Sequence, residues 1–73
     1  MNRRGYSATV VELTPRMRDV LACAAAGLSI DATALELGIA STTVVSLRAA
    51  ACSRLGAANV VQAVALAVRS GAL

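Results

Sequence analysis

The sequence predicts one all-α domain of four helices. The chain has 73 residues, of which 58% are hydrophobic, so it can form one small core. Its apolar residues are mostly Ala, Val and Leu, and its single aromatic side chain is a tyrosine, a composition that favours closely packed helices over sheets. Apolar residues also recur at helical spacing between single glycines. We expect a basic N-terminal arm over residues 1–13 and a helical domain over residues 14–73.

The first helix is expected over residues 15–26. Thr14 suits the N-cap position, where its hydroxyl accepts a hydrogen bond from a free amide of the first turn. Pro15 fits that turn because its φ is already helical and it has no N–H to leave unpaired. Gly27 ends the helix, since glycine adopts a positive φ at little cost. The apolar row of this helix is Met17, Val20, Leu21, Ala24 and Leu28.

Two further helices are expected over residues 30–37 and 42–55. Ser29 caps the shorter helix, and Gly38 begins the turn that separates the pair. Gly56 ends the longer helix. The residues expected on the inner side of the shorter helix are Ile30, Thr33, Ala34 and Leu37. The apolar row of the longer helix is Val44, Leu47, Ala51 and Leu55.

The segment over residues 30–55 has the spacing of a helix-turn-helix. Ala34 is small enough to let the second helix of the pair cross the first closely, and Gly38 can adopt the turn conformation that most residues avoid. The side chains expected to fill the space between the helices are Ile39, Val44 and Leu47. This geometry presents the longer helix as a protruding rod, which is the shape that a DNA major groove admits.

The last helix is expected over residues 60–70, between a cap at Asn59 and a stop at Gly71. It is apolar nearly all round, because only Gln62 and Arg69 interrupt its surface. Such a helix needs one apolar partner in its own core and one elsewhere, which favours a homodimer over a helix used wholly by its own core. The residues expected to form the dimer are Val60, Val61, Val64, Ala65, Ala67 and Val68.

A series of short motifs lies in one register, without a gap, over residues 13–68. The motifs are Leu13-Thr14-Pro15-Arg16, Asp19-Val20-Leu21, Ala25-Ala26-Gly27-Leu28-Ser29, Ala34, Leu37, Thr43-Val44, Leu55-Gly56, Asn59 and Gln62-Ala63-Val64. Together they resemble the LuxR/FixJ-type DNA-binding domain. The resemblance implies a third helix that reads double-stranded DNA and a fourth helix that pairs two subunits. It also implies a standalone member, since no receiver or ligand-sensing domain precedes residue 13.

The chain departs from this family at several positions. Members usually carry glutamates at the places of Met17 and Ala32, where they close capping boxes that this chain leaves open. Members also carry basic residues where this chain has Thr42 and Val45, and a histidine where it has Leu47. The third helix therefore offers hydroxyls and small apolar groups in place of a row of cations.

The predicted DNA contacts lie on the third helix and in the N-terminal arm. Val45 and Ala49 suit thymine methyl groups, and Arg48 is the guanidinium placed to bind a guanine or a phosphate through two hydrogen bonds. Arg3 and Arg4 either enter a minor groove or belong to an ordinary solvated tail. The full set is Ser41, Thr42, Thr43, Val45, Ser46, Arg48, Ala49, Arg54, Arg3 and Arg4.

The rival prediction is an interaction module of the same fold that binds a protein of the transcription machinery through Val45, Ala49 and their neighbours. The neutral third helix favours this rival. Arg48, the basic arm and the net charge of +3 favour DNA.

No enzyme active site, metal site or cofactor is expected. The chain has no histidine, and Cys23 and Cys52 form no CxxC pair, so a zinc site lacks its usual ligands. No nucleophile has a base beside it, and the glycines are single helix stops instead of a phosphate-binding loop. We expect both cysteines to be reduced core residues, with a disulfide left open.

A membrane protein is not expected either. The longest apolar runs, residues 20–26 and 63–68, are well below the roughly 18 residues that cross a bilayer. The arginines near the N-terminus are followed by no apolar segment of the kind found in secretory signals. These features predict a cytoplasmic protein.

Overall fold

The computed structural model describes residues 13–73, and this part of the chain forms four α-helices and no strand. The helices are α1 (Pro15–Ala25), α2 (Ile30–Leu37), α3 (Ser41–Leu55) and α4 (Val60–Arg69). The predicted all-α class is confirmed. The observed bounds differ from the predicted ones by a single residue at the end of α1, the start of α3 and the end of α4.

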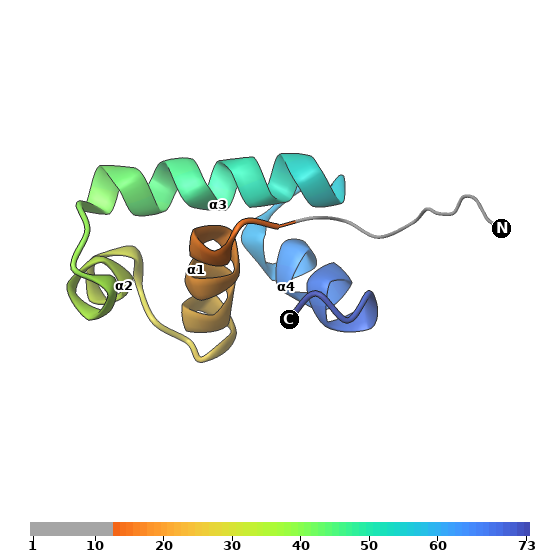
Figure 1. The fold of residues 1–73 in the computed structure, drawn as a ribbon, viewed down its shortest axis with the longest axis horizontal. Coiled ribbons are helices and arrows are strands. Elements are labelled where there is room, and N and C mark those ends of the chain that lie inside the picture. Colours follow the sequence, from red (N-terminus) through yellow and green to blue (C-terminus); the bar gives the residue numbers. More distant parts are fainter. Residues whose placement is uncertain (1–12) are drawn as a thin grey trace, which may run out of the picture.

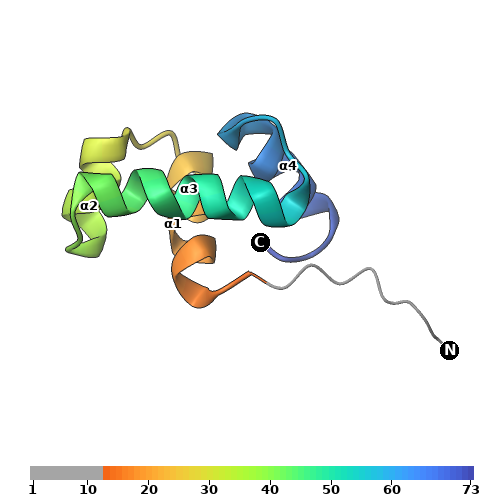
Figure 2. The same cartoon turned by 90° about the horizontal axis from the view of Figure 1, so that it is seen from above.

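The helix α3 lies along one side of the molecule, and the other three helices lie beneath it (Figure 1). The helix α2 sits at the N-terminal end of α3, α4 sits near its C-terminal end, and α1 lies between them. Seen from above, α3 runs across the other helices (Figure 2). The outer side of α3 is therefore covered by no other helix of residues 13–73.

The turn between α2 and α3 has the geometry of a helix-turn-helix. The two helices are bent by 104° relative to one another, inside the range of roughly 90–120° that this motif shows. Gly38 adopts the left-handed conformation at φ 67°, and the N–H of Ile39 donates to the carbonyl oxygen of Ala34 at 3.0 Å. This hydrogen bond closes the end of α2 and turns the chain toward α3.

The first two helices begin with the side-chain caps that the sequence predicts. The N–H of Met17 donates to Thr14 Oγ1 at 3.2 Å, and Pro15 occupies the first helical position. The N–H of Ala32 donates to Ser29 Oγ at 3.0 Å. Each contact pairs one amide that the helix itself leaves without a partner.

The last two helices differ at their starts. Ala40 precedes α3 and has no side chain that can accept a hydrogen bond. At α4, the N–H of Gln62 donates to Asn59 Oδ1 at 2.9 Å, and Gln62 Oε1 accepts from the N–H of Ala58 at 2.6 Å. This reciprocal pair resembles a capping box and leaves α4 better capped than α3.

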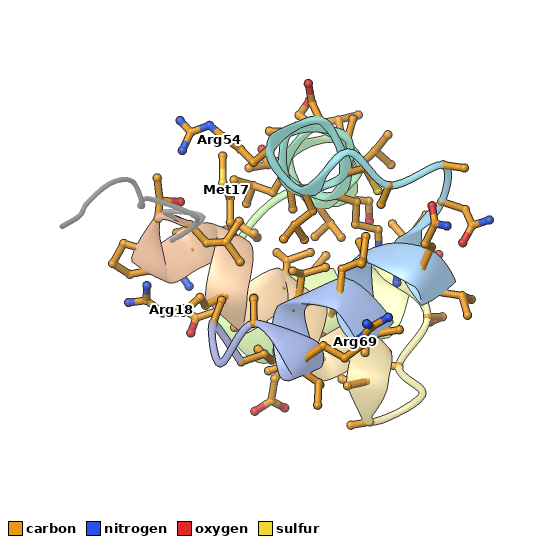
Figure 3. The ribbon with its side chains drawn as sticks, turned by 90° about the vertical axis from the view of Figure 1, so that its right-hand side faces the viewer. Met17, Arg18, Arg54 and Arg69 are labelled. Atoms are coloured by element: carbon orange, nitrogen blue, oxygen red, sulfur yellow. The ribbon has the colours of Figure 1, made fainter. Side chains whose placement is uncertain are left out.

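The first of two buried clusters, here the large cluster, joins α1, α4 and the C-terminal half of α3. Leu13, which we expected to end the N-terminal arm, is only 5% exposed and belongs to this core. Figure 3 shows Met17 on α1, pointing toward α3. The buried members of the large cluster are Leu13, Met17, Leu21, Ala51, Ala63 and Ala67.

The second cluster, here the small cluster, joins α1, α2 and the N-terminal half of α3. Its buried members are Val20, Ala34 and Val44, with half-buried Ile30, Leu37, Ile39 and Leu47 packed against them. The predicted filling of the helix-turn-helix by Ile39, Val44 and Leu47 is therefore confirmed. Neighbouring residues of α1 enter different clusters, because Val20 belongs to the small one and Leu21 to the large one.

Two buried polar atoms near the helix-turn-helix have no hydrogen-bond partner. Thr33 on α2 is fully buried, and its Oγ1 is unpaired. Arg48 on α3 is half-buried, and its Nε is also unpaired. An unpaired buried polar group costs on the order of 1–3 kcal/mol.

Candidate nucleic-acid interface

The outer face of α3 gathers most of the residues that we predict to contact DNA. The exposed part of this face is made of hydroxyls and small apolar groups, with Val45 51% exposed. An α-helix with its side chains is about 10–12 Å across, which matches a major groove of about 12 Å. Figure 2 shows α3 lying across the other helices, with this side uncovered. Its exposed members are Thr42, Thr43, Val45, Ser46 and Ala49.

Ser41 opens this face and is held by the preceding helix. It is half-buried, and its hydroxyl donates to Asp31 Oδ1 at 2.7 Å. Asp31 lies in the first turn of α2, where its charge also complements the helix dipole. The contact crosses the turn and fixes the start of α3 to the start of α2. The sequence alone did not single out Asp31, because its contact with Ser41 depends on how the turn brings the two helix starts together.

A shallow groove of about 430 Å³ lies where α2 meets the start of α3. Leu35 stands at its edge and is 86% exposed, more than the other large apolar side chains of residues 13–73. The lining residues are Asp31, Ala34, Leu35, Gly38, Ile39, Ala40 and Ser41. Sequence reasoning missed this groove, because its walls come from both helices of the pair.

Arg48 lies beside the outer face of α3 instead of on it. Its Nη2 donates to the carbonyl oxygen of Leu28 in a long hydrogen bond of 3.4 Å. The structure therefore turns this guanidinium toward the loop between α1 and α2, a contact that the sequence did not predict. This hydrogen bond uses one of the five N–H donors of the guanidinium, so a contact with guanine or phosphate must use the others or replace it.

The other arginines of residues 13–73 contribute little charge to the outer face of α3. On α1, Arg16 pairs with Asp19 at 3.5 Å, and Arg18 donates to the carbonyl oxygen of Leu13 at 2.8 Å. Figure 3 places Arg18 and Arg69 below α3, whereas Arg54 lies level with it, in its last turn. Of the two predicted contacts in the N-terminal arm, Arg3 and Arg4 lie outside the described residues.

The helix α4 separates its apolar residues into two faces as expected. On the inner face, Ala67 is fully buried, while Val60 and Val64 are half-buried against the large cluster. On the outer face, Val61 is 77% exposed and Val68 is 57% exposed. Ala65 is exposed beside them.

This division corrects the predicted dimer set. Ala67 is fully buried within its own protomer, so its side chain is not open to a second copy. The surface that remains, here the α4 patch, consists of Val61, Ala65 and Val68. A hollow of about 210 Å³ beside the patch extends it onto α1 and is lined by Ala24, Ala25, Val60, Val61 and Val64.

Residues 13–73 show neither a metal site nor a membrane-spanning helix. No three metal-ligating side chains cluster there, and no single helix there is long and apolar enough to cross a bilayer; α2 and α3 reach that length only together, across their bend. Cys23 and Cys52 carry free thiols, and both are half-buried instead of fully enclosed in the core.

Comparison with known proteins identifies the family of the chain. Residues 11–67 match the family described as bacterial regulatory proteins of the luxR family. No curated protein matches the chain. The matched segment covers most of the sequence, and it contains α1, α2, α3 and most of α4, including the turn at Gly38. The chain therefore belongs to the LuxR family of bacterial regulatory proteins, whose helix-turn-helix domain binds DNA.

Proposed function

We propose that this protein is a cytoplasmic transcription regulator that binds a pseudo-palindromic DNA site as a homodimer. The observation that carries the proposal is the uncovered outer face of α3, held on α2 across the 104° bend. Side chains on such a face contact base edges when the helix lies in the major groove. The exposed members in the N-terminal half of α3 are Thr42, Thr43, Val45 and Ser46.

The α4 patch supports the dimer. A 73-residue domain gains much from burying further apolar surface, and exposed valines beside exposed alanine allow two helices to approach closely. In a closed twofold pair, Val61 and Val68 of one copy lie against the same residues of the other. Such a pair places two α3 helices about one DNA turn, ~34 Å, apart.

The shortage of cations on α3 sets the expected strength of binding. If each subunit neutralises about three phosphates, affinity falls less steeply with salt than it does for strongly basic repressors. Tight binding then requires both subunits, so the dimer and the DNA site stabilise one another.

The experiment is selection of bound sequences from random duplex DNA at two salt concentrations. We expect enrichment of a pseudo-palindrome, with retention that falls as salt rises. A folded protein that enriches no sequence, and whose background retention is insensitive to salt, contradicts the proposal. That result favours the rival function, docking onto a protein of the transcription machinery, for which exposed Leu35 and Val45 are the candidate anchors.

A further inference from the structure

The hydroxyl of Ser41 has its hydrogen-bonding direction fixed. A serine hydroxyl carries one proton, and in this structure that proton is donated to Asp31 Oδ1 at 2.7 Å. An ionised carboxylate accepts hydrogen bonds and cannot return one. Ser41 Oγ therefore presents only acceptor lone pairs to a ligand approaching the start of α3. No hydrogen bond constrains the hydroxyls of Thr42, Thr43 or Ser46 in the described structure, so they remain free to donate or accept.

Val45 stands one helical turn beyond Ser41 on the same side of α3. Residues four apart in a helix are neighbours on its surface. The Val45 side chain is 51% exposed and offers an apolar contact. The start of the face thus combines an acceptor with a methyl-bearing side chain, and Arg48 lies beside it with its Nη2 donating to the carbonyl oxygen of Leu28 at 3.4 Å.

Base pairs differ in whether they complement this combination. In the major groove, an adenine–thymine pair presents the N6 amino donor of adenine and the 5-methyl group of thymine. A guanine presents two acceptors, O6 and N7, which an acceptor-only hydroxyl repels. A cytosine presents an amino donor, but its pair has no methyl group for Val45.

We propose that the start of α3 reads adenine–thymine pairs, with Ser41 accepting from adenine N6 and Val45 contacting the thymine methyl group. Asp31 is a positioning residue, because it determines the polarity of Ser41 without touching the base. Its negative charge also keeps phosphate oxygens away from this end of the helix. This inference rests on the proposed function and names the class of sequence within the half-site.

The test uses the enriched duplex with single chemical changes in the bases. Replacing each adenine of a half-site in turn by purine removes the N6 amino group and leaves N7. At one position we expect wild-type affinity to fall about fivefold, the value of one hydrogen bond. Ser41→Ala should bind the adenine and purine duplexes equally, because it has no acceptor to lose. Replacing thymine by deoxyuracil removes one methyl group and should cost wild type about fourfold, and Val45→Ala much less.

The role of Asp31 is tested with a matched pair of variants. Asp31→Asn and Glu36→Gln remove the same charge from the same helix, and Glu36 is exposed and has no hydrogen bond in the structure. An asparagine amide can either accept from Ser41 through Oδ1 or donate to it through Nδ2, so the hydroxyl is no longer held in one direction. We expect Asp31→Asn to lose part of its preference for adenine over guanine at the Ser41 position, while Glu36→Gln keeps the wild-type preference.

The outcomes separate this inference from the proposed function. Failure of wild type to enrich any sequence overturns the proposed function. If a site is enriched but wild type and Ser41→Ala lose the same affinity on purine substitution, adenine recognition by Ser41 is overturned and the proposed function still stands. Equal loss of adenine preference in Asp31→Asn and Glu36→Gln overturns the positioning role of Asp31. Circular dichroism of each variant confirms that it is folded.

Discussion

The two ends of α3 are built differently. At the α4 end, the helix packs on the large cluster, and the neighbouring α4 begins with the reciprocal contacts of Asn59 and Gln62. At the helix-turn-helix end, the helix packs on the small cluster, starts without a side-chain cap and lies near the unpaired Thr33 Oγ1 and Arg48 Nε. Both buried side-chain atoms that lack a partner in residues 13–73 therefore lie near the end that we propose to meet DNA.

This difference indicates where stability and recognition reside. Native proteins are stable by only about 5–15 kcal/mol, so one or two unpaired groups are a large fraction of the total. We expect the α4 end to contribute most of the stability of the fold and of the proposed dimer. The helix-turn-helix end is expected to contribute less, and it leaves the outer face of α3 uncovered. Regions that recognise ligands are commonly among the less stable parts of a structure.

The largest expected loss of stability comes from truncating one core side chain at the α4 end. Leu21→Ala empties a fully buried position of the large cluster and should lower the free energy of unfolding by about 2–5 kcal/mol. Val20→Ala, its neighbour in the small cluster, removes less volume and should cost less. Urea denaturation measures both, with Leu35→Ala, an 86% exposed position, as a control expected within about 0.5 kcal/mol of wild type. If Val20→Ala lowers the free energy of unfolding more than Leu21→Ala does, the helix-turn-helix end contributes more to stability than the α4 end.

A second variant tests the α4 patch alone. Val61→Asp places an unpaired charge in the proposed dimer contact and should raise the dimer dissociation constant by about 100-fold, because burying such a charge is costly. Val61 is 77% exposed in the protomer, so the monomer should stay folded. Leu35→Asp is the matched control on α2. Sedimentation that shows an unchanged dimer for Val61→Asp excludes this position from the interface.

At the helix-turn-helix end, a substitution should stabilise the protein. Thr33→Val keeps the shape of a fully buried side chain and removes a hydroxyl that has no partner, so the free energy of unfolding should rise by about 1 kcal/mol. Thermal unfolding followed by circular dichroism measures the change. Thr43→Val, at an exposed position of α3, is the control. A loss of stability in Thr33→Val shows that its hydroxyl is paired, for example through water.

The smallest effect concerns the missing cap of α3. Ala40→Ser supplies an oxygen at the N-cap, as Ser29 does for α2, and should raise the free energy of unfolding by about 0.5–1 kcal/mol. Ser29→Ala should cost a similar amount. Equal stability of Ala40→Ser and wild type would mean that the N–H of Thr43, which donates to the carbonyl oxygen of Ala40 at 3.0 Å, gains nothing from a side-chain cap.

The sequence predicted what depends on neighbours along the chain. Caps such as Thr14 and Ser29, stops such as Gly38 and the two faces of α4 follow from spacing and local chemistry, and the structure confirms them. The sequence did not predict contacts that depend on packing. The turn of Arg48 toward Leu28 joins residues twenty positions apart and depends on how α3 crosses the loop before α2.

The outer face of α3 could be predicted from the sequence only in part. Its exposed members on α3 could be named from helical period alone, because residues 3 or 4 apart share a side. The polarity of Ser41 could not, since it depends on Asp31 across the turn. The buried state of Ala67 also required the structure, because a helix that is apolar nearly all round does not by itself show which apolar row faces inward.

The stability of this fold should depend on the chirality of any residue that replaces the glycine in two of its turns. Gly38 and Gly56 have φ of 67° and 66°, and a Cβ added at either would meet no atom within 4 Å. A D-alanine adopts this backbone region without strain and restricts the unfolded chain, so it should stabilise the protein by roughly 0.5 kcal/mol at each site. An L-alanine should destabilise it by about 1 kcal/mol. A chain of 73 residues is within reach of chemical synthesis, and the two mirror-image substitutions would then have effects of opposite sign, although the added methyl group contacts no other atom in either position.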